Sequence, residues 1–302
     1  MMKVAAIDVG TNSTRLLIAE VSRDFKLRVI HSDLVTTRLG EGISAGCLME
    51  TAMVRTVAAI KTFFQYAQKM QVERVIIAAT SAVRDAVNRD VFSDMVYQKT
   101  GIKPLVLSGE QEAAIGYRGV QGGMVGAADG LVVLDVGGGS TEICWQQNET
   151  VYFASVNVGA VRMTEGGHSD EEITGLLRPL LKQIDLKQVD NLVAVGGTAT
   201  TLAAIIQQLA VYDPRKVHGF IITQQQIERV LQRLSSLSID ERKNIPGLQP
   251  QRADIIVAGV RIIKQMLDLL QVNKFIVSEA DILWGLVINA AANVDKKPNT
   301  TY

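Results

Sequence analysis

The sequence predicts an α/β protein made of two similar halves. Short apolar runs typical of buried strands alternate with stretches whose apolar residues recur every three or four positions, as in amphipathic helices. The chain has 302 residues, more than one hydrophobic core usually serves, and this favours two domains. A segment that begins at Asp8 recurs at Asp135, so the two domains are expected to be duplicates of one unit.

Residues 1–125 are assigned to the first domain, which opens with three consecutive strands. Its predicted strands are 3–9, 15–22, 25–36, 72–80 and 103–108. Its predicted helices are 48–70, 90–99 and 110–121. The segment 122–130, GGMVGAADG, is rich in Gly and Ala and is the best linker candidate, which places the domain boundary after residue 125.

Residues 126–302 are assigned to the second domain, which is expected to be the more helical of the two. Its predicted strands are 130–136, one ending near Gln147, 151–158, 191–195 and 274–277. Its predicted helices are 200–209, 223–235, 252–271 and 281–294. The sequence leaves open whether the last helix packs on the second domain or back on the first.

The repeat is carried by DVGTNSTRLL (8–17) and DVGGGSTEIC (135–144). The two segments agree at five of ten positions, and their starts are 127 residues apart, a domain-sized spacing. The shared Asp, Ser and Thr are not needed for packing a core, so duplication explains the match better than chance similarity of glycine-rich turns does.

The charge balance excludes several classes of partner. The chain has 31 Lys and Arg against 31 Asp and Glu, with a net of +3 in residues 1–125 and −3 in the rest. No basic field is present that would hold nucleic acid or an anionic membrane by bulk attraction. We therefore expect no nucleic-acid partner and no membrane partner, and a polyanionic ligand would have to be bound by local groups.

The two cysteines and the N-terminus indicate a cytoplasmic protein. Cys47 and Cys144 form no C-x-x-C pair, which fits reduced thiols better than a disulfide framework. Asp8 comes too early for the apolar stretch of a signal peptide, and no apolar run reaches the length of a membrane span. The three histidines lack zinc-ligand spacing, which argues against a His/Cys metal site.

Three turns rich in Gly, Ser and Thr follow predicted strands and are candidate phosphate-binding sites. Glycine lets the backbone approach an anion and point N–H groups at it, and a hydroxyl adds a donor. Neither G-x-x-x-x-G-K-[ST] nor a complete G-x-G-x-x-G occurs, which excludes a P-loop and argues against dinucleotide binding. The candidate residues in the turns are Asn12, Ser13, Thr14, Gly137, Gly138, Gly139, Ser140, Thr141, Gly196, Gly197 and Thr198.

Asp8 and Asp135 lie directly before two of these turns. A carboxylate there would repel phosphate unless a divalent cation lay between them, and Mg²⁺ is commonly held by one or two carboxylates and several waters. The pair therefore predicts a Mg²⁺ site, or a site for another divalent cation, next to phosphate.

The motifs resemble those of the acetate and sugar kinase, Hsp70 and actin superfamily and, within it, the exopolyphosphatase and guanosine pentaphosphate phosphatase family. The resemblance implies two duplicated ribonuclease H-like (actin-like ATPase) domains with a phosphate- and metal-binding cleft between them. The motifs occur in family order along essentially the whole chain and are DVGTNSTRLLIAE (8–20), TTRLGEG (36–42), ATSAVRDA (79–86), SGEQEA (108–113), LDVGGGSTEI (134–143), VGGTATTLAA (195–204) and RADIIVAG (252–259).

The resemblance also implies roles for charged residues. Glu112 matches the catalytic glutamate, and we assign it to the attacking water. Glu142 matches the second essential carboxylate, and we assign it to the metal or to positioning that water. Arg15, Arg38 and Arg84 match basic motif positions and are expected to bind phosphate.

Two positions depart from the family pattern. Gln111 stands where glutamate is commonest, which weakens any role for that position and leaves Glu112 intact. The segment SEADILWG (278–285) lacks the arginine that many relatives have there, so a ligand contact from this segment is in doubt.

The function implied by the resemblance is a Mg²⁺-dependent phosphoanhydride hydrolase. It would release terminal phosphate from inorganic polyphosphate, convert guanosine pentaphosphate to the tetraphosphate, or do both. A phosphotransferase of the same superfamily and a non-catalytic nucleotide-binding sensor are open alternatives. A homodimer is also expected, because the chain ends without the helical C-terminal domains that help long relatives enclose polyphosphate.

Overall fold

The computed structural model describes residues 1–124, 130–147, 150–182, 184, 189 and 191–292. The chain divides into two compact units: unit 1 is Met1–Val125 together with the segment from Ala280 onwards, and unit 2 is Gly126–Glu279. Most of the linker candidate 122–130 lies outside the described residues. The final helix belongs to unit 1, which is one of the two placements that the sequence left open.

Unit 1 contains a five-stranded sheet in the order β3-β2-β1-β4-β5. Its strands are β1 (Met2–Val9), β2 (Thr14–Val21), β3 (Leu27–Val35), β4 (Arg74–Ala79) and β5 (Leu105–Val106). The first three strands pair antiparallel in sequence, whereas β4 runs parallel to β1 and β5 parallel to β4. Parallel neighbours need long crossover connections, and these supply the helices of the unit.

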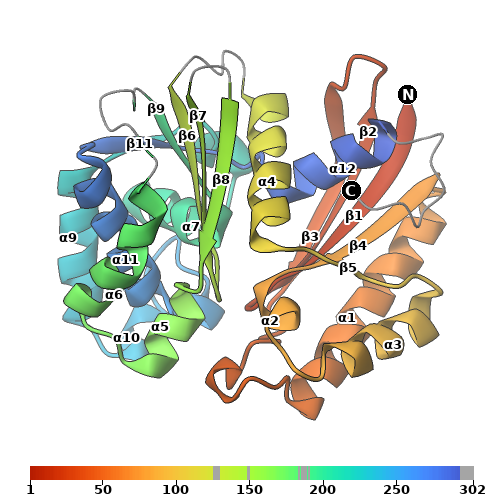
Figure 1. The fold of residues 1–302 in the computed structure, drawn as a ribbon, viewed down its shortest axis with the longest axis horizontal. Coiled ribbons are helices and arrows are strands. Elements are labelled where there is room, and N and C mark those ends of the chain that lie inside the picture. Colours follow the sequence, from red (N-terminus) through yellow and green to blue (C-terminus); the bar gives the residue numbers. More distant parts are fainter. Residues whose placement is uncertain (125–129, 148–149, 183, 185–188, 190, 293–302) are drawn as a thin grey trace. The chain divides into compact units, whose positions relative to one another are not determined.

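Helices cover both faces of this sheet (Figure 1). Successive side chains of β1 point to opposite faces, so Ile7 packs in one apolar cluster with Ile60 of α1, and Val4 in another with Leu286 of α12. The helices of unit 1 are α1 (Glu50–Lys69), α2 (Ser81–Arg84), α3 (Arg89–Thr100), α4 (Gly109–Gly123) and α12 (Ile282–Ala292), with a short 3-10 turn η1 (Ile43–Ala45).

Helices α4 and α12 cross so closely that only glycine fits at the contact. A Cβ on Gly119 would lie 1.9 Å from the carbonyl oxygen of Asp281, and a Cβ on Gly285 would lie 1.9 Å from that of Ile115. The absence of side chains at both glycines lets the two backbones touch. This contact places residues from the end of the chain beside α4, β1 and β2.

Unit 2 repeats this sheet and adds one strand at the edge, in the order β10-β11-β9-β6-β7-β8. Its strands are β6 (Leu131–Val136), β7 (Thr141–Gln147), β8 (Thr150–Val156), β9 (Asn191–Val195), β10 (Ile221–Thr223) and β11 (Lys274–Val277). The series β8-β7-β6-β9-β11 has the same order and strand directions as β3-β2-β1-β4-β5.

The two units also agree in hairpin register. Asp8 lies opposite Arg15 in the first hairpin, and Asp135 lies opposite Glu142 in the corresponding hairpin of unit 2. Both turns are closed by the same backbone hydrogen bond, from a glycine N–H to a serine carbonyl three residues later, at 3.0 Å in each case. The duplicated α/β fold predicted from the sequence is confirmed.

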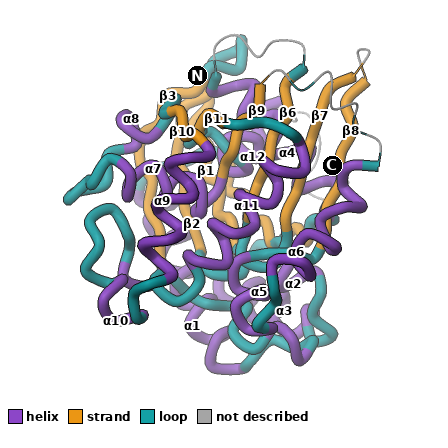
Figure 2. The backbone as a smooth tube through the Cα atoms, turned by 90° about the vertical axis from the view of Figure 1, so that its left-hand side faces the viewer, coloured by secondary structure: helices purple, strands orange, loops and turns teal. Residues whose placement is uncertain are grey.

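Helices α7, α9 and α11 lie over the strands of the second sheet (Figure 2). The helices of unit 2 are α5 (Ala160–Gly166), α6 (Asp170–Leu177), α7 (Gly196–Ile206), α8 (Pro214–Val217), α9 (Gln224–Ser235), α10 (Ile239–Arg242) and α11 (Ile256–Leu270), with 3-10 turns η2 (Arg178–Leu181) and η4 (Pro250–Arg252). The prediction that a helix starts at residue 200 was wrong by one turn, because α7 already begins at Gly196 and includes the third glycine turn.

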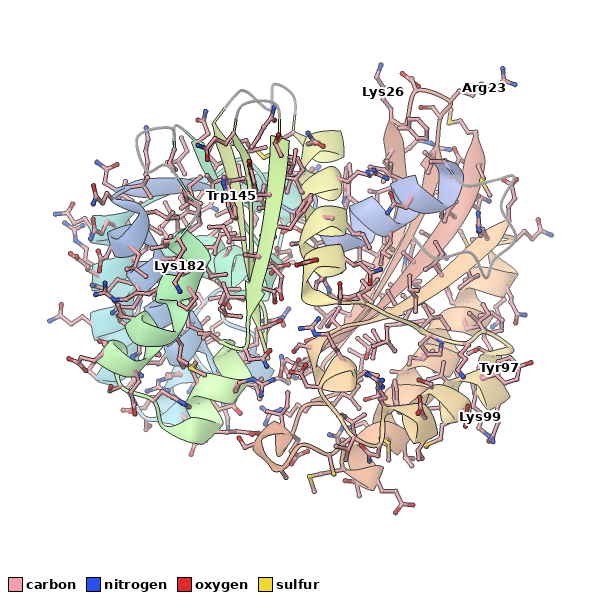
Figure 3. All side chains as sticks on the ribbon, viewed as in Figure 1. Arg23, Lys26, Tyr97, Lys99, Trp145 and Lys182 are labelled. Carbon is pink, nitrogen blue, oxygen red and sulfur yellow. The ribbon has the colours of Figure 1, made fainter. Side chains whose placement is uncertain are left out.

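Trp145 on β7 marks the core of unit 2 (Figure 3). Its ring stacks on that of Tyr152 on β8, with 5.3 Å between ring centroids. Among the residues described, no helix is both long and apolar enough to cross a membrane.

Candidate functional site

In unit 1 the predicted phosphate-binding turn between β1 and β2 is bonded to the loop that carries Arg38. The N–H groups of Arg38 and Gly40 donate to the carbonyl oxygens of Asn12 and Thr11, both at 2.8 Å. A Cβ on Gly40 would lie 2.2 Å from Thr11 Cγ2, so glycine is needed for this approach. Arg38 has a φ of +48°, a conformation that costs a non-glycine residue energy and that concentrates at functional sites.

The predicted phosphate ligands Thr14 and Thr141 use their hydroxyls to hold neighbouring loops. Thr14 Oγ1 lies 2.9 Å from Thr37 Oγ1, and Thr141 Oγ1 donates to the carbonyl oxygen of Val158 at 2.6 Å. Neither threonine has any exposed surface. The two residues occupy equivalent positions in the duplicated units, and each fixes the loop that follows the third strand of its sheet.

The predicted catalytic Glu112 lies against Arg84. Arg84 Nη1 donates to Glu112 Oε2 at 2.7 Å and to the carbonyl oxygen of Leu107 at 3.2 Å. Arg84 ends the short helix after β4, and Glu112 lies in the first turn of the helix after β5. Because β4 and β5 are parallel neighbours, the segments that follow them meet at one edge of the sheet.

Gln111 caps the helix that carries Glu112. Its side chain Oε1 accepts from the Ser108 N–H at 2.9 Å, while Ser108 Oγ accepts from the Gln111 N–H at 3.1 Å. This reciprocal pair is a capping box, in which glutamine and glutamate serve equally well. The departure from the family pattern at this position therefore preserves the start of α4.

Asp8 and Arg15, two further predicted site residues, are bonded directly to each other. Arg15 Nε and Nη2 donate to Asp8 Oδ2 at 3.0 and 2.7 Å, and Arg15 Nη1 donates to Asp281. Burial raises the pKa of Asp8 against the lowering effect of Arg15. Burial works against the charge of Arg15, but Asp281 and Asp8 outweigh it and raise the pKa of the guanidinium.

In unit 2 the two predicted metal ligands lie side by side. Asp135 and Glu142 are directly opposite on β6 and β7, so their side chains share one face of the sheet. Glu142 is buried, and its Oε1 accepts a hydrogen bond from Ser155 Oγ at 2.7 Å. Two carboxylates this close favour a cation between them.

The third glycine turn lies against Asp135. A Cβ on Gly196 would be 2.4 Å from Asp135 Oδ1, and Gly196 has a φ of +84°. A Cβ on Gly197 would be 2.2 Å from Arg252 Nη1, and Thr198 Oγ1 donates to the carbonyl oxygen of Val136 at 3.3 Å. The start of α7, the Asp135 carboxylate and a guanidinium thus meet at one place.

The glycine turn 137–139 is held by the start of α5. The N–H groups of Ala160 and Val161 donate to the carbonyl oxygens of Gly137 (2.9 Å) and Gly138 (2.8 Å), and Arg162 Nε donates to that of Gly139 at 2.8 Å. The turn therefore has its carbonyl groups toward α5. Ser140 is buried in the same turn.

Sequence reasoning missed four residues at these sites. Arg252 opens the motif RADIIVAG, so its place at the head of a recognised motif was a usable signal. Asp281 lies in the segment in which a ligand contact was doubted, and no pattern linked it to Arg15. Arg162 and Ser155 carry no signal in a single sequence, because only the folded loops bring them to the turn and to Glu142.

The residues present fit a divalent cation held by few carboxylates. Within the described ranges, no group of three or more His, Cys, Asp or Glu side chains is arranged to hold a metal. Mg²⁺ often keeps several waters and needs only one or two carboxylates. The adjacent Asp135 and Glu142 offer hard oxygen ligands, and Asp8 Oδ1 is a buried oxygen with no hydrogen-bond partner.

Residues 17–292 match the Ppx/GppA phosphatase family. The chain belongs to this family. It is 34% identical to exopolyphosphatase 2 of Mycobacterium tuberculosis, over 96% of this chain and 99% of that protein. It is 27% identical to the guanosine-5'-triphosphate,3'-diphosphate pyrophosphatase of Photobacterium profundum, over 94% of this chain and 58% of that protein.

The solved structure of the Aquifex aeolicus Ppx/GppA enzyme has the same fold. It matches with a TM-score of 0.78 and 31% identity, over 95% of this chain and 99% of that one. The family resemblance and the actin-like fold expected from the motifs are confirmed. The relatives support a hydrolase that acts on phosphoanhydrides.

Proposed function

We propose that this protein releases terminal phosphate from inorganic polyphosphate with the help of Mg²⁺ or another divalent cation. The observation that carries the proposal is the 2.7 Å contact between Arg84 and Glu112 at the start of α4. It fixes a carboxylate for water activation beside a positive charge, and hydrolysis of a phosphoanhydride needs both. Guanosine pentaphosphate is the second candidate substrate, since one relative is named for that activity over part of its length.

In the proposed reaction, the oxygen of a water molecule forms a bond to the terminal phosphorus. The bond from that phosphorus to the bridging oxygen breaks, and the shortened chain leaves with the electron pair. Glu112 orients the water and accepts its proton, while Arg84 keeps the Glu112 carboxylate in place. The divalent cation, when bound, neutralises charge on the phosphate oxygens.

Unit 2 supplies the proposed phosphate and cation ligands around Asp135. We assign cation binding to Asp135 and Glu142, which are opposite one another on adjacent strands. The start of α7 at Gly196 and Gly197 suits an anion, because an 11-residue helix presents unpaired N–H groups at its N-terminus. Arg252, which lies against Gly197, adds positive charge there.

The remaining assignments in unit 1 follow the motifs. Asp8 is proposed as a further cation ligand, and Arg15 as the residue that holds it. Arg38, Asn12 and Ser13 are proposed to contact phosphate at the first turn, where the loop of Arg38 is bonded to Asn12. Ser140 and Gly137–Gly139 are proposed to do so at the second turn.

The proposal includes a cytoplasmic location and a homodimer. The location is supported by Cys47 and Cys144, both of which are free cysteines. The dimer would extend the binding surface for a long polyanion, and the molar mass in solution tests it.

The function is tested by phosphate release from long-chain polyphosphate, tripolyphosphate and guanosine pentaphosphate, with and without a chelator. We expect the highest kcat/KM with long-chain polyphosphate and loss of activity on chelation. Phosphate transfer that requires an added acceptor would instead support a phosphotransferase. Binding of nucleotide without turnover under any divalent cation would support a sensor.

The catalytic assignment is tested by Glu112→Gln, with Glu110→Gln as a matched control in the same helical turn. Glu110 is exposed and Glu112 is held by Arg84. We expect Glu112→Gln to lower kcat by about 100-fold or more, the usual contribution of a general base. Glu110→Gln is expected to stay within about twofold of wild type, and equal activity of both variants would contradict the assignment.

A further inference from the structure

One guanidinium in unit 1 joins two carboxylates from opposite ends of the chain. Arg15 Nε and Nη2 donate to Asp8 Oδ2 at 3.0 and 2.7 Å, and Arg15 Nη1 donates to Asp281 Oδ2. The exposed fraction is 6% for each carboxylate side chain and 23% for Arg15. The three side chains therefore form a largely desolvated cluster at the end of the β1–β2 hairpin.

Asp281 is held firmly in this cluster by the helix that it precedes. Its Oδ1 accepts a hydrogen bond from the Leu283 N–H at 3.0 Å, and its carbonyl oxygen accepts one from the Gly285 N–H at 3.1 Å. Its backbone also touches α4, where a Cβ on Gly119 would lie 1.9 Å from its carbonyl oxygen. Only Oδ2 is directed to Arg15, so a fixed backbone sets the position of the guanidinium.

The arrangement leaves one oxygen of Asp8 for a ligand. Both donors of Arg15 go to Asp8 Oδ2, and Asp8 Oδ1 is buried with no hydrogen-bond partner. A buried carboxylate oxygen without a partner is costly and is satisfied by a cation or water.

The charge count of the cluster depends on Asp281. Two carboxylates and one guanidinium carry a net charge of −1, whereas Asp8 and Arg15 alone would be neutral. The corresponding pair in unit 2, Asp135 and Glu142, consists of two acids. Where the first hairpin has an arginine in place of the glutamate, Asp281 restores the negative charge.

We infer that Asp281 is a positioning residue for divalent-cation binding at Asp8, acting through Arg15. This inference rests on the proposed function, in which Asp8 is a cation ligand. Asp281 draws the guanidinium to itself, holds Asp8 in one orientation and keeps the cluster attractive to a cation. A residue that served only to cap α12 would support stability and leave cation affinity unchanged.

The test measures Mn²⁺ binding to the full chain by electron paramagnetic resonance of free Mn²⁺, without any substrate. Asp281→Asn removes the charge and keeps a good helix cap, because asparagine caps helices as well as aspartate does. We expect its Kd for Mn²⁺ to rise roughly tenfold, while Asp8→Asn weakens binding at least as much. Phosphate release by Asp281→Asn should require correspondingly more cation and recover at saturation.

Asp213→Asn is the matched control. Asp213 also caps a helix and also pairs with an arginine, Arg215, at 3.1 Å, but it lies in unit 2 outside the proposed cation ligands. Its Kd for Mn²⁺ should stay within about twofold of wild type. If Asp281→Asn does not fold by circular dichroism, Asp281→Ser, which also caps helices and lacks the charge, takes its place with the same expected result.

The outcomes separate the inference from the proposed function. Weaker Mn²⁺ binding in Asp8→Asn with wild-type binding in Asp281→Asn would overturn the role of Asp281 and leave the Asp8 site standing. Wild-type binding in both variants would overturn Asp8 as a cation ligand and the inference with it. Weaker binding in both, with Asp213→Asn unchanged, is the result that supports the inference.

Discussion

Arg84 Nη1 lies 2.7 Å from Glu112 Oε2, although the two residues come from motifs 28 positions apart. The contact follows from the parallel pairing of β4 and β5, which brings the helices after these strands to the same edge of the sheet. Arg84 also lies 3.5 Å from Asp85, so its guanidinium is held on two sides. A rotation of Glu112 would therefore require breaking an ion pair that is mostly shielded from water.

The first prediction concerns this pair. Arg84→Met should lower kcat by about 10- to 100-fold, because Glu112 loses its orientation and an adjacent buried carboxylate loses its partner. Arg89→Met is the control, since Arg89 is exposed in the same region and makes only a 3.5 Å contact with the Arg84 carbonyl oxygen. Steady-state phosphate release measures both, and equal kcat values for the two variants would show that Arg84 does not support Glu112.

A second prediction compares two glycines with positive φ. Gly196 and Gly219 have φ values of +84° and +80°, but a Cβ on Gly196 would meet Asp135 Oδ1 at 2.4 Å, whereas one on Gly219 would meet nothing within 4 Å. Gly219→Ala should cost about 1 kcal/mol of unfolding free energy through backbone strain alone. Gly196→Ala should cost at least about 1 kcal/mol more and displace Asp135.

Denaturant unfolding and phosphate release together decide the glycine comparison. Gly196→Ala is expected to lose most activity under conditions in which it is fully folded, and Gly219→Ala to keep it. Full activity in folded Gly196→Ala would mean that the position of Asp135 is not important for the reaction.

The third prediction tests the crossing of α4 and α12. Gly116 and Gly119 lie in the same helix, but a Cβ on Gly116 meets nothing within 4 Å and a Cβ on Gly119 meets the Asp281 backbone at 1.9 Å. Gly116→Ala should raise the unfolding free energy by about 0.5–1 kcal/mol, the helix-propensity gain. Gly119→Ala should lower it by about 1–3 kcal/mol, because α12 must move away.

Thermal or urea unfolding measures the pair of helix variants. Since Asp281 precedes α12, Gly119→Ala should also weaken Mn²⁺ binding, and Gly116→Ala should leave it unchanged. Equal stabilities of the two variants would show that α12 does not pack on α4 as described.

A fourth prediction concerns the thiols. Cys47 is exposed, whereas Cys144 is buried and burial raises the pKa of its thiol. The neutral thiol of Cys144 is thereby favoured, so its reactive thiolate is scarce at pH 8 in the folded state and more abundant after unfolding. A colorimetric thiol reagent at pH 8 should titrate about one thiol in native protein and two in denaturant. Cys47→Ser should remove the native signal, and rapid labelling of that variant would contradict the burial of Cys144.

The duplicated fold was predictable because its signals are local. The strand–turn–strand segments at Asp8 and Asp135 carry glycines, hydroxyl residues and apolar runs whose meaning depends on immediate neighbours. The predicted strand 191–195 and the predicted strand 274–277 coincide with β9 and β11 for the same reason. The start of α7 was misplaced because its first turn is made of glycine and threonine, which are weak helix formers held there by contacts with β6.

The sequence by itself determined the α/β class, the repeat, the family motifs and the pairing of carboxylates with glycine turns. The tertiary structure decided which charges meet. Asp281 reaches Arg15 only because two glycine-containing helices cross at backbone contact, and Arg252 reaches Gly197 only because Gly197 has no side chain. Such contacts depend on the packing of distant segments, in which a few ångströms determine whether two charges interact, and no local pattern of residues records that distance.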